Sequence, residues 1–105
     1  MEKKFWFATL LERAEMNPAT GLPDYGSKHT IGFSTDFDQM ELALNTNALD
    51  IQEGCYRFAF LEAYEPGVYP MALERVFYVW DQERRGFFRA EEMECFRHLC
   101  NFALC

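Results

Sequence analysis

A ten-residue stretch, CYRFAFLEAY at positions 55–64, places one carboxylate among large aromatic rings. If the stretch is a β-strand, its side chains alternate between two faces, and a carboxylic acid held against apolar rings can act as a general acid. A partner on a neighbouring strand or on the backbone is the favoured explanation of Glu62, so we assign no catalytic residue. Four rings share the predicted face of Glu62: Tyr56, Phe58, Phe60 and Tyr64.

The C-terminal region carries the residue types that zinc prefers, in the run Cys95-x2-His98-x-Cys100-x4-Cys105. This spacing matches neither the paired Cys-x2-Cys nor the paired His-x3-His arrangement, and apolar residues interleave it. We therefore expect no metal and no cofactor, and we expect the cysteines to be reduced thiols.

The abundance of aromatic residues suggests a surface that binds another protein, because interfaces are enriched in Tyr, Trp, Phe and Met. The favoured function is a non-catalytic protein-interaction module, whose partner is another protein or a second copy in a homodimer. Two alternatives remain open: a small-ligand binder or minor enzyme with Glu62 in an aromatic-lined pocket, and an acidic decoy of a nucleic-acid-binding protein. The candidate contact residues are Glu62 and five rings: Tyr25, Tyr56, Tyr64, Tyr69 and Trp80.

Charge and composition narrow the partners further. The 105 residues include 17 acidic and 10 basic side chains, which give a net charge of -7 that repels phosphate backbones and anionic membranes. The acidic residues are spread along the chain rather than clustered, which disfavours the decoy. No stretch approaches the roughly 20 apolar residues that a transmembrane helix needs. We expect a cytoplasmic protein that binds neither nucleic acid nor membrane.

Apolar spacing and turn residues predict the elements that position these side chains. We expect a strand over residues 3–13, an irregular connection over 15–28, a short strand over 29–33 and a helix over 36–46. Ser34 or Thr35 is expected to cap the helix, and Asn45 and Asn47 are its expected exit residues.

The second half of the chain reads mainly as strands. We expect strands over residues 55–64, 76–80 and 87–89, with the last two joined in a hairpin by the turn DQERRG, and then helical turns over 91–99 and an edge segment over 101–105. This order predicts one α+β domain over residues 1–105. It would be an antiparallel sheet of about four to six strands with one main helix, residues 36–46, on one face.

Several short motifs occur along the second half of the chain and just before it. They are Thr30, Gly32 and Phe33, then Asp50-Ile51-x-Glu53, Tyr56, Ala59 and Glu62, then Pro66-Gly67-x-Tyr69-Pro70, Trp80-Asp81 and Asn101-Phe102. Together they resemble the motifs of a group of small bacterial proteins that has no assigned function. The resemblance covers residues 30–104 and implies a compact intracellular domain of bacterial origin, but it implies no activity and no site residues.

Overall fold

A computed structural model describes residues 4–66 and 72–91 of the chain. Its elements follow one another as β1 (Phe5–Leu11), β2 (Glu15–Met16), β3 (Pro23–Asp24), β4 (Lys28–Ser34), α1 (Phe37–Asn45), a 3₁₀ turn (Ala48–Asp50), β5 (Phe58–Tyr64), β6 (Glu74–Asp81) and β7 (Gly86–Arg89).

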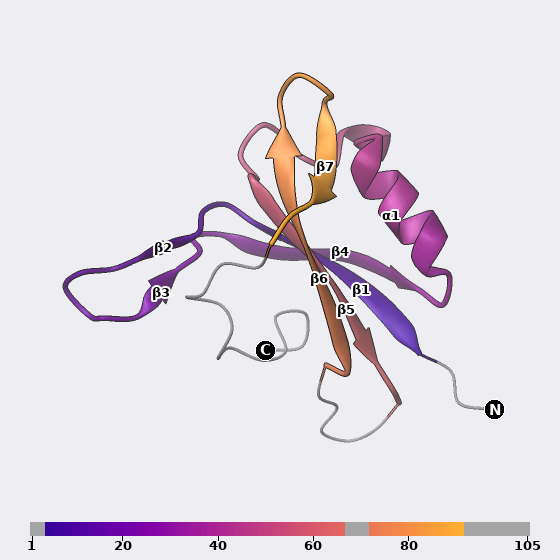
Figure 1. Ribbon diagram of the computed structural model, residues 1–105, viewed down its shortest axis with the longest axis horizontal. Helices are drawn as coiled ribbons and strands as arrows, with labels where there is room; N and C mark the ends of the chain where they lie inside the picture. The colour runs from indigo at the N-terminus through magenta and orange to yellow at the C-terminus, as the bar shows by residue number, and fades with distance from the viewer. Residues whose placement is uncertain (1–3, 67–71, 92–105) are drawn as a thin grey trace.

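The main sheet has five antiparallel strands in the order β4-β1-β5-β6-β7, and α1 lies on one of its faces (Figure 1). This confirms the predicted α+β fold with one helix. The predicted helix and the predicted hairpin between β6 and β7 are also confirmed. The segments over 91–99 and 101–105 lie beyond Glu91 and almost wholly outside the described residues.

The face of the sheet beneath α1 combines small residues with large ones. Ala8 and Ala59 are fully or almost fully buried there, and their short side chains allow the helix to approach the strands closely. Leu44 of α1 packs in the same cluster, as do Leu61 and Trp80. Helix α1 therefore covers the face of β5 that carries Ala59 and Leu61.

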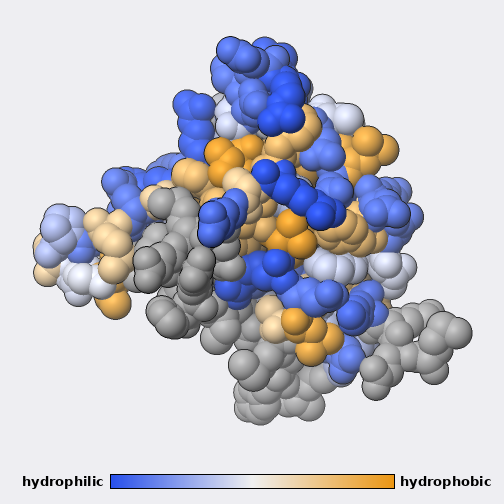
Figure 2. All heavy atoms as spheres, in the orientation of Figure 1, coloured by the Kyte–Doolittle hydropathy of each residue, from blue (hydrophilic) through white to orange (hydrophobic). Residues whose placement is uncertain are grey.

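The opposite face carries a second cluster built from larger rings. Leu11, Phe60 and Phe77 are buried at its centre, and Tyr25 packs against them from the connection before β4. Figure 2 shows hydrophilic side chains over the turn of the β6–β7 hairpin, with hydrophobic side chains gathered below it toward α1.

The residue that caps the start of helix α1 differs from the prediction, whereas a predicted exit residue follows its end. The N-cap is Asp36, whose carboxylate accepts a hydrogen bond from the Gln39 backbone N–H at 3.2 Å, and not the hydroxyl of Ser34 or Thr35. Ser34 instead accepts a bond from the Asp36 N–H. Asn47 has a φ of 49° after the helix, as expected of an exit residue that tolerates the left-handed region.

Two other segments differ from the prediction. The connection over 15–28 contains a short antiparallel ladder, β2 with β3, which projects from the body of the molecule as an arm (Figure 1). The base of the arm is fixed because the Glu12 and Arg13 N–H groups both donate to the Tyr25 carbonyl.

Strand β5 begins at Phe58, three residues later than predicted, because the chain before it forms a series of turns.

Candidate functional site

Glu62 lies in the middle of the sheet face opposite α1 and is fully buried. Its cross-strand neighbour on β6 is Arg75, whose Nε and terminal nitrogen lie 3.1 and 3.0 Å from Glu62 Oε2. The Arg75 guanidinium also lies over the Phe60 ring, 5.4 Å from its centroid. The carboxylate is therefore one half of a buried ion pair between strands, which favours a structural role over proton transfer to a ligand.

The aromatic candidates are buried on two different sides of the sheet. Tyr64 is 2% exposed and meets Phe7 edge-on on the Glu62 side, at a centroid distance of 5.4 Å. Tyr56 and Trp80, which are 7% and 8% exposed, belong to the cluster beneath α1. The prediction that Tyr56 shares a face with Glu62 is wrong, because Tyr56 precedes the first residue of β5.

Trp80 is fixed at both ends of its indole. Its ring meets Phe87 edge-on at 5.2 Å, and its Nε1–H donates to Gln82 Oε1 at 2.8 Å. The structure gives no exposed ring at Tyr56, Tyr64 or Trp80, and Tyr69 lies outside the described residues.

A different set of rings reaches the surface at the β4 edge of the sheet. Phe33 is 64% exposed, and its ring stacks on Phe7 of β1 at a centroid distance of 5.3 Å and an interplanar angle of 27°. Phe5 meets Phe33 edge-on at 6.2 Å, and Ile31, two residues earlier on β4, is 36% exposed. We call these four residues, Phe5, Phe7, Ile31 and Phe33, the edge surface.

The edge surface was missed by sequence reasoning because the strand order that places β4 at the edge of the sheet has no local signal. Strand β4 reads KHTIGFS, and its residues alternate between half-buried and exposed positions. Among the described residues, β4 pairs with a strand on one side only, so the aromatic side chains lie beside backbone groups that face outward.

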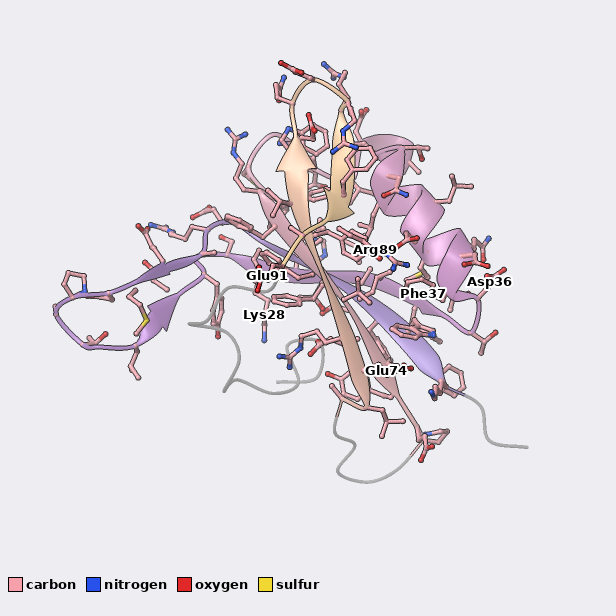
Figure 3. The ribbon with its side chains drawn as sticks, in the orientation of Figure 1. Lys28, Asp36, Phe37, Glu74, Arg89 and Glu91 are labelled. Atoms are coloured by element: carbon pink, nitrogen blue, oxygen red, sulfur yellow. The ribbon has the colours of Figure 1, made fainter. Side chains whose placement is uncertain are left out.

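A polar network ties α1 to strands β6 and β7 on the face of the sheet that the helix covers. Tyr78 of β6 is fully buried, and its hydroxyl donates to Glu41 Oε2 at 2.5 Å. The same oxygen accepts a short hydrogen bond from Arg89 of β7, whose guanidinium reaches over the Phe37 ring at the start of α1 (Figure 3). Burial and the bond to Glu41 raise the pKa of Tyr78, so its hydroxyl keeps its proton. This network fixes the helix on the sheet.

An open depression of about 570 Å³ lies beside the β6–β7 hairpin. Arg84 covers the Phe88 ring at its rim, 3.7 Å from the centroid, and pairs with Asp81 at 2.7 Å. Arg89 at the same rim pairs with Glu41. These cations have partners within the chain, which disfavours the depression as an anion site.

The described ranges 4–66 and 72–91 contain no group of three side chains placed to hold a metal ion. Cys95, His98, Cys100 and Cys105 all lie outside these ranges. Cys55 is an exposed free thiol. In the part of the chain that is described, no helix has the length and apolar character needed to cross a bilayer.

Comparison of the chain with models of protein families, with curated proteins and with solved structures finds no match.

Proposed function

We propose that this chain is a non-catalytic protein-interaction module that binds its partner through the edge surface. The observation that carries the proposal is the position of Phe33, which is 64% exposed yet held in place by stacking on Phe7. A rigid exposed ring beside half-buried ones resembles the aromatic anchors that dominate protein interfaces. We therefore propose the edge surface as the contact surface in place of Tyr56, Tyr64 and Trp80, since all three of these residues are buried.

The lack of charged residues in the strands of the edge surface supports a protein partner. No formally charged residue occurs from Phe5 to Leu11 or from Thr30 to Thr35, although the whole chain carries -7. The edge surface therefore lies in a neutral part of an acidic molecule. Depletion of charge at the centre of the contact is typical of protein interfaces and unlike a surface that binds phosphate backbones.

We also place the module in the cytoplasm, as a member of the group of small bacterial proteins that its motifs resemble. The exposed thiol of Cys55 supports a reducing compartment, because exposed free cysteines are prone to oxidation elsewhere.

Photo-crosslinking in cells that produce this protein tests whether the edge surface binds a partner. A photoreactive amino acid is placed at Phe33 in one variant and at Leu42 in a second, since Leu42 is similarly exposed at 61% but lies on α1. We expect a defined crosslinked product from position 33 only, and we expect Ile31→Asp to reduce it several-fold. No product at position 33, or equal products at both positions, would contradict the proposal.

A further inference from the structure

Gly32 lies between Ile31 and Phe33 on β4, beside the β-bulge that interrupts the pairing of β4 with β1. Its φ lies outside the left-handed region, and a Cβ built there would meet no heavy atom within 4 Å. Glycine inside a strand often marks a bulge, and the bulge between Thr30 and Gly32 accounts for its presence here. Among the described residues nothing occupies the space at Gly32, so a further strand can lie along β4 and a larger side chain fits at this position.

The charges at the two ends of β4 are opposite. Lys28 begins the strand, and Asp36 follows its last residue by two positions, so that the two lie at opposite ends of β4 in Figure 3. The residues between them carry no formal charge. A second β4 strand running antiparallel would bring each lysine end to an aspartate end, whereas a parallel strand would bring like charges together.

The exposed apolar residues fit the same antiparallel arrangement. If Gly32 lies opposite Gly32 of a second copy, Ile31 of each copy lies opposite Phe33 of the other, and Lys28 lies opposite Asp36. Pairs of β-branched and aromatic residues across strands are favourable. The β-bulge in the pairing of β4 with β1, between Thr30 and Gly32, opposes a long regular ladder. The bulge lies inside residues 30–34, so the new pairing over this range would be short and bent at Ile31.

We propose that the partner at the edge surface is a second copy of this chain, bound through antiparallel β4 strands about a two-fold axis at Gly32. This inference rests on the proposed function and names the partner. The axis is perpendicular to the sheet, so the two five-stranded sheets become continuous and both copies of α1 lie on the same side. Repulsion between two charges of -7 is screened over about 8 to 10 Å at physiological salt, and the contact itself is free of acidic side chains except Asp36.

The register has a specific test, because only a two-fold axis at Gly32 places this residue opposite itself. We expect light scattering after size exclusion to give the unmodified chain twice the 12.4 kDa of a single copy. Gly32→Asp and Gly32→Lys should each be folded monomers, with a dissociation constant raised at least tenfold, since like charges would meet at the axis. Mixing the two variants should restore a dimer that contains one copy of each.

The controls are Leu42→Asp and Leu42→Lys, which make the same charge changes on the exposed side of α1 and should remain dimers. Circular dichroism checks that every variant is folded. A dimer that survives both Gly32 substitutions would overturn the β4 contact, and failure of the mixture to restore it would overturn the register. An unmodified chain that stays monomeric would overturn self-association. The proposed function would then still be decided separately by crosslinking from Phe33 to a different protein.

Discussion

Gly86 is the residue at which the β6–β7 hairpin touches the end of α1. A Cβ at this position would lie 1.9 Å from the Asn45 carbonyl oxygen and 2.7 Å from its carbonyl carbon. Because both atoms belong to the backbone of the helix, no side-chain rotation can relieve the contact. Any residue other than glycine would push the hairpin and the helix apart.

We predict that Gly86→Ala lowers the free energy of unfolding by about 2–3 kcal/mol, as overpacking of a well-filled core does. Urea denaturation at neutral pH measures the change. Gly32→Ala is the matched control, since its Cβ would meet open space and the chain should be equally stable or more stable. Equal stability of the two variants would show that helix and hairpin are not in close contact.

A second prediction concerns the buried carboxylate of Glu62. Arg75→Met should lower the free energy of unfolding by about 3–5 kcal/mol, because it removes the cation facing a fully buried charge. Lys4→Met removes the cation of an exposed pair, Lys4 with Glu74, and should have a much smaller effect. Chemical denaturation of both variants makes the comparison, and similar losses would be evidence against a structural ion pair.

Single residues were the least predictable level of this structure. The alternation in β5 correctly placed Phe60, Glu62 and Tyr64 on one face, but it could not identify Arg75 as the partner of Glu62, because that contact depends on the register with β6. Tyr56 was assigned to the wrong face because a strand pattern was extended across turns in which side chains no longer alternate.

At the scale of elements, the bonds that hold α1 on the sheet depend on pH. Burial would raise the pKa of Glu41, but hydrogen bonds from Arg89 and Tyr78 outweigh it and hold this pKa below its ordinary value of 4.5. A carboxyl whose pKa is lower in the folded state stabilises the fold above its unfolded pKa. That stabilisation is lost as the pH falls through the folded value.

We therefore predict that Glu41→Gln costs about 1 kcal/mol at pH 7, less than the roughly 1.5–3 kcal/mol of a buried bond to a charged group, because Glu41 and Arg89 are partly exposed. The difference from the unmodified chain should shrink as the pH falls below about 4.5. Urea denaturation across this pH range measures it, with Glu83→Gln in the exposed hairpin turn as the control. A difference that is independent of pH would contradict the assigned role of Glu41.

The bounds of helices and strands were predicted better than the contacts of single residues, because the spacing of apolar residues and the turn residues that set these bounds lie within each element. The helical spacing of Phe37, Met40 and Leu44 places α1 within one residue of its observed bounds, and the turn DQERRG marks the β6–β7 hairpin. The ladder of β2 with β3 was missed because its strands have two residues each, too few for any alternation. The order of strands in the sheet has no local signal, so the edge position of β4 and its exposed rings emerged only with the structure.

At the scale of the whole molecule, we predict a single cooperative unfolding transition that does not depend on metal. A domain with one shared sheet and clusters on both faces needs no zinc to fold, whereas a structural zinc site would couple folding to the metal. A chelator should leave the Tm unchanged, and elemental analysis should find less than stoichiometric zinc. A Tm that drops on chelation would instead indicate a metal site, with Cys95, His98, Cys100 and Cys105 as its candidate ligands.

The position of β1 between β4 and β5 has a consequence for synthesis on the ribosome. Its sequence, FWFATLL, is translated before both of the strands that pair with it, and β5 ends only at Tyr64. At 5–20 residues per second, this uncharged segment remains without its full set of neighbours for roughly 3 to 10 seconds. An apolar segment with unpaired backbone groups is prone to intermolecular pairing, so the nascent chain is more vulnerable to aggregation than the folded one.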